Sequence, residues 1–286
     1  MGNEFALFVG CTTLARLGAY EISARKVAED LGVELVDMDG AGCCGTTFME
    51  SIDRKTGLAM AARNICIAEE MGLDIVALCN GCAEVLTKAN RTLKEEEGLR
   101  DEINEVLAGA NREFKGTVEV KHLVRMLVED VGVDEIGGLI KRPFKGLKAA
   151  VHPGCHLIRP HEVMRFDDPE VPIYFDSLVN VTGAVSVNYP NKLECCAAAV
   201  LAIREELAYN IALEKVATVK KYADIMVTSC PFCYLQYEMS QLTASESYDV
   251  PVIHLPQLLG LALGLGYDEL ALYENRIDPS RIMNFL

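Results

Sequence analysis

Ten of the eleven cysteines in this chain of 286 residues fall into two copies of one pattern. Each copy has a single cysteine, then an adjacent pair, then a C-x-x-C. Cysteines that only fill a core carry no such spacing, because they pack as small apolar side chains wherever space allows. The repeat therefore predicts two sites for a soft metal. The motif cysteines are Cys11, Cys43, Cys44, Cys79 and Cys82 in the first copy, and Cys155, Cys195, Cys196, Cys230 and Cys233 in the second.

The number of thiols in each copy favours an iron-sulfur cluster over zinc. A structural zinc ion is closed by four Cys or His ligands, so five thiols would leave one without a role. Disulfides are a second alternative, but the chain is far longer than the small secreted scaffolds that depend on them. Its first residues, 1–5, also lack the basic start and apolar run of a secretion signal. We expect reduced thiols in a cytoplasmic protein, with zinc at one or both sites as the remaining alternative.

Composition excludes two classes of partner. The formal net charge of −15 disfavours nucleic acids and anionic lipid surfaces, since both attract positively charged proteins. The longest apolar run, residues 255–265, is interrupted by Pro256, Gln257 and two glycines, and is too short to span a bilayer. We expect no nucleic acid partner and no membrane-spanning segment.

The duplication extends beyond the cysteines and predicts the fold. Residues 4–11 and 148–155 both contain an apolar strand that ends in a glycine and the first cysteine of a copy. Short strands alternate with longer helical patterns, for example at 15–31, 55–71 and 200–222. This order predicts an α/β fold of two duplicated, Rossmann-like domains, each a parallel sheet flanked by helices. We place the domains at 1–145 and 146–286, with the linker at residues 143–146.

Each cysteine group directly follows a predicted strand. In open α/β sheets, ligands bind at the carboxyl edge, where the loops after the strands meet. We therefore expect the two metal sites to lie at the carboxyl edges and to face each other, with all ten cysteines pointing into a common space. The strands are predicted near 5–9, 33–38 and 75–78 in the first half, and near 149–152, 185–188 and 225–228 in the second.

The loop around the adjacent pair differs between the halves. Residues 40–45 contain three glycines, which let the backbone turn sharply and bring its N–H groups close to a cluster. Ala197 replaces the glycine that follows the pair in the first copy. We expect either a negative φ at Ala197 or a second site that is less tightly wrapped.

The doubled pattern resembles the CCG, or cysteine-rich, domain family over essentially the whole chain. A chain made of two such domains is similar to the B-type subunits of the heterodisulfide reductases of methanogenic archaea. The resemblance implies two noncubane [4Fe-4S] clusters, each held by the five motif cysteines of one half. It also implies reductive cleavage of the small-molecule mixed disulfide of coenzyme M and coenzyme B. Because other members of the family only transfer electrons, a non-catalytic iron-sulfur subunit of a flavin-dependent dehydrogenase complex is the alternative.

The resemblance also implies further polypeptides as partners. The chain lacks the C-x-x-C-x-x-C-x-x-x-C-P run of a ferredoxin module. Electrons would therefore come through two other subunits, one ferredoxin-like with iron-sulfur clusters (the C type) and one that contains flavin (the A type). A hydrogenase or a formate dehydrogenase would feed this complex.

Five residues other than the cysteines are candidates for proton donation to a disulfide substrate or for binding it. His152 and His156 flank Cys155 and are placed to donate protons. The implied substrate carries a sulfonate and a phosphate, which basic side chains near the cysteine loops would bind. These candidates are Arg16, Arg159 and Lys192.

Other polar or reactive residues have structural interpretations. Cys66 lies in an apolar helical stretch without a partner cysteine, so we predict a core residue. His122 and His254 recur at equivalent strand ends, away from the cysteine loops, and we predict hydrogen bonds in the core. The charge cluster at 94–97 is predicted to be the solvated end of a helix.

Overall fold

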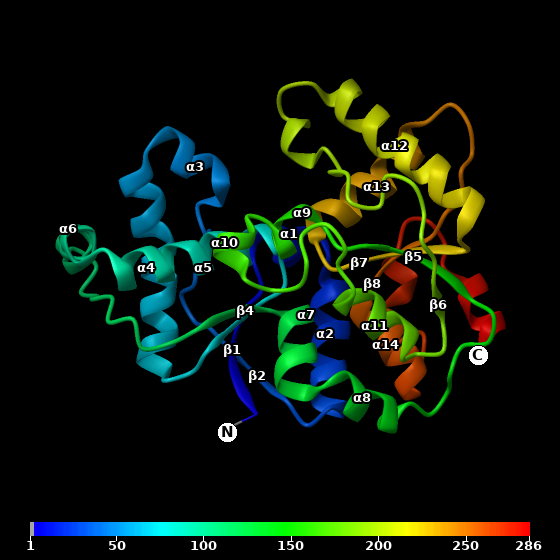
Figure 1. Cartoon of the computed structure of the whole chain (residues 1–286), viewed down its shortest axis with the longest axis horizontal. Coiled ribbons are helices and arrows are strands. Elements are labelled where there is room, and N and C mark those ends of the chain that lie inside the picture. Colours follow the sequence, from blue (N-terminus) through cyan, green and yellow to red (C-terminus); the bar gives the residue numbers. More distant parts are fainter. Residues whose placement is uncertain (1–2) are drawn as a thin grey trace.

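Two four-stranded parallel sheets lie at the centre of the molecule, one in each half of the chain (Figure 1). The computed structural model describes residues 3–286. The strand order is β2-β1-β3-β4 in the first sheet and β6-β5-β7-β8 in the second, so the two halves repeat one topology. The prediction of duplicated α/β domains is confirmed, while the boundary at 145/146 stays a prediction. Within sheets the register is regular, with Ala6 opposite Ile75 and Ala149 opposite Ile225.

The first half contains four strands and nine helical segments. Its strands are β1 (Glu4–Phe8), β2 (Glu34–Asp37), β3 (Ile75–Ala77) and β4 (Val120–His122). Its helices are α1 (Cys11–Arg16), α2 (Gly18–Asp30), α3 (Thr46–Ile52), α4 (Arg54–Met71), α5 (Asn80–Glu95), α6 (Glu97–Ala108), α7 (Leu123–Met126), the π-helical turn η1 (Leu127–Val131) and α8 (Val133–Leu139).

The second half repeats this order with shorter helices after its first strand. Its strands are β5 (Lys148–His152), β6 (Val185–Ser186), β7 (Ile225–Thr228) and β8 (Val252–His254). Its helices are α9 (Cys155–Ile158), α10 (His161–Met164), α11 (Tyr174–Asn180), α12 (Glu205–Tyr222), α13 (Pro231–Thr243) and α14 (Leu255–Leu263), with 3₁₀ turns η2 (Ala198–Val200), η3 (Leu272–Glu274) and η4 (Ser280–Phe285).

Helices cover both faces of each sheet, which explains why the inner strands are apolar throughout. All residues of β3 and β7 are buried, as expected for parallel strands enclosed on two sides. In Figure 1, α3 to α6 lie on the outer side of the first sheet, and α12 and α13 lie over the second. Helix α14 packs against α2 across the two halves, and all of its residues are buried. This contact joins the two sheets into one core.

Three predicted elements differ in detail. The helix expected over 15–31 is divided into α1 and α2, because Leu17 leaves the helical conformation. The helix expected from Val200 begins at Glu205, after the turn η2 that follows the second cysteine pair. The charge cluster at 94–97 lies at the junction of α5 and α6, where Lys94 donates a hydrogen bond to the Val118 carbonyl as well as reaching solvent.

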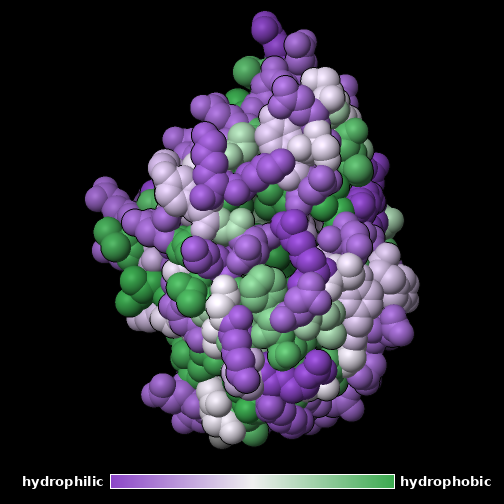
Figure 2. Space-filling model, turned by 90° about the vertical axis from the view of Figure 1, so that its right-hand side faces the viewer, coloured by the Kyte–Doolittle hydropathy of each residue, from purple (hydrophilic) through white to green (hydrophobic). Residues whose placement is uncertain are grey.

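The surface carries mainly hydrophilic side chains, in line with the strong negative charge. Figure 2 shows the face beside α12 and the C-terminal end, where hydrophobic residues are interspersed among hydrophilic ones. Among residues 3–286, no helix combines the length and the apolar character that crossing a membrane requires.

Candidate metal centre

The topology of each sheet brings the first and last cysteine loops of a half together. The chain leaves β1 toward β2 on one side and later enters β3 on the other, so the loops that follow β1 and β3 are neighbours at the carboxyl edge of the sheet. Cys11 begins α1 just beyond β1, and Cys79 caps α5 just beyond β3. In the second half, Cys155 and Cys230 hold the same places after β5 and β7.

Glycines at the ends of the first strands allow the sulfurs to approach. Gly10 and Gly154 have φ values of +80° and +76°, a region that favours glycine. A Cβ on Gly10 would lie 3.4 Å from the Sγ of Cys82, and one on Gly154 would lie 3.7 Å from the Sγ of Cys233. A Cβ on Gly154 would also lie 2.4 Å from Asn80 Nδ2, so this glycine lets the two halves come together beside the cysteines.

The ten motif thiols form one continuous row. Cys44 Sγ lies 3.3 Å from Cys82 Sγ in the first half. At the middle of the row, Cys79 of the first half lies close enough to Cys230 of the second for each thiol to shift the pKa of the other. From one end to the other the order is Cys11, Cys43, Cys44, Cys82, Cys79, Cys230, Cys233, Cys196, Cys195 and Cys155.

The cysteines in the middle of the row are buried, and those near its two ends are more exposed to solvent. Its six inner cysteines are buried, whereas Cys11, Cys43 and Cys195 near the two ends are exposed and Cys155 is half-buried. The row is therefore enclosed at the junction of the two halves and open to solvent at both ends.

The thiols in the row shift each other's pKa values, some upward and some downward. Its hydrogen bond with Cys82 is the main cause that lowers the pKa of Cys44 to about 7. The pKa of Cys230 is lowered by its thiol neighbours Cys233 and Cys79, whose own pKa values are raised. Adjacent thiols cannot all ionise because like charges repel at contact distance. A row that supplies ten thiolates needs positive charge among them, which metal ions provide.

Backbone N–H groups wrap the adjacent pairs in both halves. Gly45 N donates to Cys43 Sγ at 3.4 Å, and Ala197 N donates to Cys195 Sγ at 3.3 Å. Ala197 has φ +63°, in the left-handed region, as Gly45 does at +94°. The expected negative φ at Ala197 is therefore wrong. Thr46 N also donates to Cys44 Sγ at 3.4 Å in the first half, so a less tightly wrapped second site stays a prediction. Hydrogen bonds of this kind tune cluster potentials.

Polar contacts between the halves hold the middle of the row. Asn80 Nδ2, at the start of α5, donates to the carbonyl of Pro153 at 2.8 Å. Tyr20 on α2 donates its hydroxyl to the Ser229 carbonyl at 2.7 Å, and Ser229 in turn donates to Asn80 Oδ1 at 3.3 Å. These bonds fix the distance between the loops that carry Cys79 and Cys230.

Of the two predicted proton donors, His152 is buried behind the second cysteine group. Its ring lies 3.3 Å from Lys215 Nζ and 3.3 Å from the hydroxyl of Tyr237. Burial is the main cause that lowers its pKa well below the ordinary value, so the ring is neutral. Lys215 was not identified from the sequence, although its spacing with Ala212, Val216 and Val219 places it on the apolar face of α12.

His156, the other predicted donor, lies at the open end of the row. Its side chain is 39% exposed, and Nδ1 lies 3.7 Å from Oε2 of Glu84 on α5. The Glu84 carboxylate is buried, which raises its pKa, and Oε2 has no hydrogen-bond partner in the described residues. The pair joins the two halves beside Cys155.

The three predicted substrate-binding residues differ in availability. Arg16 is exposed in the last turn of α1. Arg159 donates to the carbonyl of Pro169. Lys192 forms an ion pair with Asp176 at 2.7 Å and is largely buried. Arg16 is thus the most accessible of the three, and a role in substrate binding stays a prediction for all of them.

The two equivalent histidines, His122 and His254, are both buried at strand ends. The ring of His122 accepts a hydrogen bond from Val124 N at 3.0 Å, as predicted. At His254 the backbone N–H donates to Gln257 Oε1 at 3.0 Å. The His254 ring stacks on Tyr20 and Tyr234, with ring centroids 3.9 and 4.2 Å apart. Both residues therefore belong to the core.

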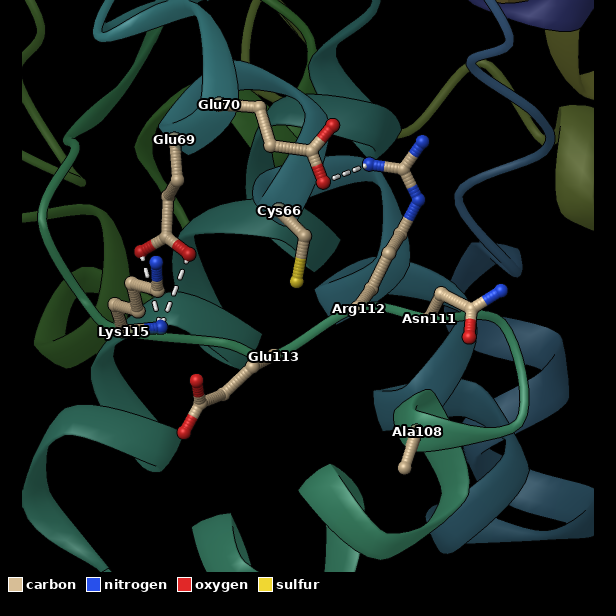
Figure 3. A pocket seen from close by; sticks show the side chains of 8 residues that line it. All are labelled: Cys66, Glu69, Glu70, Ala108, Asn111, Arg112, Glu113 and Lys115. Atoms are coloured by element: carbon tan, nitrogen blue, oxygen red, sulfur yellow. Dashed lines mark hydrogen bonds and ion pairs between the residues drawn. The ribbon is translucent and has the colours of Figure 1, made fainter.

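Cys66 is a core residue, as predicted, and is 1% exposed. It lines a cavity of about 420 Å³ beside the C-terminal ends of α4 and α6 (Figure 3). Burial raises the pKa of its thiol to about 12. The cavity is lined by Cys66, Glu69, Glu70, Ala108, Asn111, Arg112, Glu113 and Lys115.

The donor set of the row suits iron-sulfur clusters. No group of three or more His, Cys, Asp or Glu side chains in residues 3–286 surrounds a single point as the ligands of one ion would. Iron-sulfur clusters are held by cysteine thiolates that bind several iron atoms, and each half supplies five cysteines. The backbone N–H groups that donate to the sulfurs of both adjacent pairs fit the same group.

The sequence matches one protein family twice. The family described as "Cysteine-rich domain" (CCG) matches residues 5–87 and 149–238, which include all ten motif cysteines. A crystal structure of a hypothetical protein from Helicobacter pylori has a similar fold, with a TM-score of 0.77 and 15% identity. The likeness covers 96% of this chain and 52% of that chain, and it concerns the fold alone.

Two named relatives resemble the chain along nearly its whole length. One is the B-type subunit of the ferredoxin/F(420)H(2)-dependent CoB-CoM heterodisulfide reductase of Methanosarcina acetivorans, 38% identical over 96% of this chain and 94% of the relative. The other is the "8-methylmenaquinol:fumarate reductase membrane anchor subunit" of Wolinella succinogenes, 34% identical over 99% of this chain and all of the relative. Both are named as subunits of redox complexes.

Proposed function

The chain belongs to the CCG cysteine-rich domain family, and from that premise we propose that it is the catalytic subunit of a heterodisulfide reductase. In this proposal each half holds one noncubane [4Fe-4S] cluster with its five motif cysteines. The substrate is the mixed disulfide of coenzyme M and coenzyme B. The protein reduces it to the two free thiols in the cytoplasm.

The observation that carries the proposal is that the loops of Cys79 and Cys230 are joined across the two halves by the hydrogen bonds of Asn80 with Pro153 and Ser229. The two five-cysteine sets therefore form one row. Two clusters bound by these sets would be neighbours across the junction of the two halves. A disulfide has two sulfur atoms, and both become thiolates when the bond breaks. Two adjacent soft-metal sites suit the capture of two thiolates, because iron favours sulfur ligands.

The reaction consumes two electrons and two protons for each disulfide. Bound clusters would supply the electrons, one at a time. The chain's own residues supply the rest of the chemistry: the backbone N–H groups at Gly45 and Ala197 stabilise negative charge on the sulfurs. His156 is solvent-accessible beside Cys155 and delivers protons to the products, while buried His152 supports the site from behind. Arg16 attracts the anionic groups of the substrate to the open end of the row.

Partner subunits complete the proposed enzyme. Since the chain has no ferredoxin module, we propose a ferredoxin-like subunit of the C type that passes electrons to the row, and a flavin-containing subunit of the A type behind it. A hydrogenase or formate dehydrogenase would supply this complex. The relatives named as subunits of larger assemblies support a multi-subunit arrangement.

A second function is favoured by the relative from Wolinella succinogenes. Its name places it in a fumarate reductase. On that alternative the chain transfers electrons for a flavin-dependent dehydrogenase complex and binds no disulfide.

An assay of the purified chain separates the two functions. The anaerobic protein, with its clusters bound, is given a reduced viologen dye as electron source and the mixed disulfide as acceptor. We expect dye oxidation that depends on the disulfide, with two free thiols formed for each disulfide consumed. Dye oxidation by the complete complex with fumarate, and none with the disulfide, would favour the alternative.

A further inference from the structure

The two halves differ at one buried position beside the adjacent cysteine pair. Asn64 on α4 and Lys215 on α12 are equivalent, because each stands fifteen residues before the first cysteine of its C-x-x-C, Cys79 or Cys230. Both are 1% exposed. A neutral amide in one half therefore corresponds to a cation in the other.

Both side chains hold the loop that carries the adjacent pair. Asn64 accepts a hydrogen bond from Gly42 N at 2.8 Å and donates to the Cys43 carbonyl at 3.2 Å. Lys215 donates to the carbonyls of Glu194 and Lys192. Both side chains thus hold the loop by hydrogen bonds to its backbone. A neutral side chain is sufficient for this in the first half, so the loop does not require the positive charge of Lys215.

The charge of Lys215 has no carboxylate among its hydrogen-bond partners. Those partners are two backbone carbonyls and the neutral ring of His152. Burial lowers its pKa to about 8, and the sulfurs of Cys233 and Cys196 act in the opposite direction. The Lys215 ammonium is thus a buried cation whose hydrogen-bond partners in the described residues are neutral.

The neighbouring charges on the same two helices are solvated. Arg63 precedes Asn64 and donates to the Gly40 carbonyl from a partly exposed position, while the equivalent residue before Lys215, Glu214, is exposed. Water and salt screen exposed charges, whereas a buried charge acts through a medium of low dielectric constant. The difference in charge between buried Asn64 and buried Lys215 therefore has a larger electrostatic effect on the two sites than the difference between Arg63 and Glu214.

We propose that Lys215 raises the reduction potential of the second site above that of the first. This inference rests on the proposed function, in which both cysteine sets hold clusters. A buried cation stabilises the more negatively charged, reduced form of a neighbouring redox group. An electron that enters the row comes to rest in the half that contains Lys215. The two sites have the same cysteine ligands, but the second site accepts electrons from the first.

The inference is tested by exchanging the two residues. The anaerobic, cluster-loaded protein is titrated electrochemically, and the two midpoint potentials are read by electron paramagnetic resonance. In Lys215→Asn, we expect the equilibrium constant for reduction of the second cluster to fall at least tenfold, which is about 59 mV for one electron. In Asn64→Lys, the potential of the first cluster should rise. The double exchange should reverse the order of the two sites.

Controls separate this effect from loss of structure. Lys221→Asn, on the exposed surface of the same helix α12, removes the same charge and should leave both potentials unchanged. Lys215→Arg should keep the potential of the wild type. If Lys215→Asn loses its second cluster, the test is the reduction potential of the first cluster in Asn64→Lys. A rise in this potential supports the inference, and an unchanged potential contradicts it.

Two results would overturn the inference. One is unchanged potentials in Lys215→Asn with full iron content, and the other is an equal shift of both sites in either single exchange. Absence of iron from the wild-type protein would instead refute the proposed function itself. Clusters of unequal potential in a protein that does not reduce the disulfide would refute only the proposed substrate.

Discussion

Ala197 and Gly45 show how one backbone conformation is built from two different residues. Both have positive φ and both present an N–H to the sulfur of the first cysteine of the adjacent pair. The left-handed conformation costs an L-residue about 1–2 kcal/mol, so the second half carries strain that the first avoids. The turn is thus required by the site.

Substitution of Gly45 by alanine tests that requirement. A Cβ there would find its nearest heavy atoms at 3.6 Å, so Gly45→Ala fits sterically and costs only the backbone strain. We expect the free energy of unfolding in urea to fall by about 1–2 kcal/mol, with iron content retained. Gly98→Ala in α6, where the added methyl meets no atom within 4 Å, is the control and should lose no stability. Loss of iron from Gly45→Ala would mean that the site needs more than this turn.

The motif cysteines and Cys66 should respond differently to serine. In Cys44→Ser and Cys196→Ser, a hard oxygen replaces a thiolate in the row, so iron content and disulfide cleavage should both fall. Cys66→Ser should keep its iron and lose about 1–3 kcal/mol of stability, the cost of burying a hydroxyl that finds no partner. Iron, sulfide and turnover are measured on all three variants. A Cys66 variant without iron, or a fully active Cys44 variant, would overturn the assignment of ligands.

At the scale of elements, the strands were predictable and the helix boundaries less so. An apolar run followed directly by a motif cysteine, or by a glycine and a motif cysteine, identifies these strands in the sequence. Strands β1, β3, β5 and β7 lie within a residue or two of the predicted ranges. The division between α1 and α2 at Leu17 was not predictable, because the apolar pattern continues through it. Lys215 was overlooked for a related reason: a single lysine on a long helix indicates a solvated residue unless the packing of α12 is known.

The contact between α14 and its surroundings depends on a small residue. A Cβ on Gly260 would lie 2.4 Å from Leu270, which is too close for any side chain. Gly260→Ala should therefore lower the free energy of unfolding by about 1–3 kcal/mol, the usual cost of overpacking a core. Thermal and urea unfolding measure the change. Gly138→Ala in α8, with open space around the added methyl, is the matched control. Equal stability of the two variants would show that α14 can move to relieve the contact.

At the scale of the whole molecule, the sequence indicated two equal halves with sites at facing edges. It did not indicate how closely the sites approach. Contacts between Cys79 and Cys230, and between Asn80 and Pro153, depend on the packing of α2 against α14, which no local pattern encodes. The difference between Asn64 and Lys215 becomes meaningful only when both are seen to hold the same loop.

Analysis of iron and acid-labile sulfide in anaerobically purified protein tests the central claim most directly. Two four-iron clusters predict about eight iron atoms and about eight sulfides for each chain, without zinc. The Cys66→Ser variant should give the same values, and Cys196→Ser should give clearly less iron. A stoichiometric amount of zinc, or iron without sulfide, would contradict the claim that the row of ten thiols holds iron-sulfur clusters.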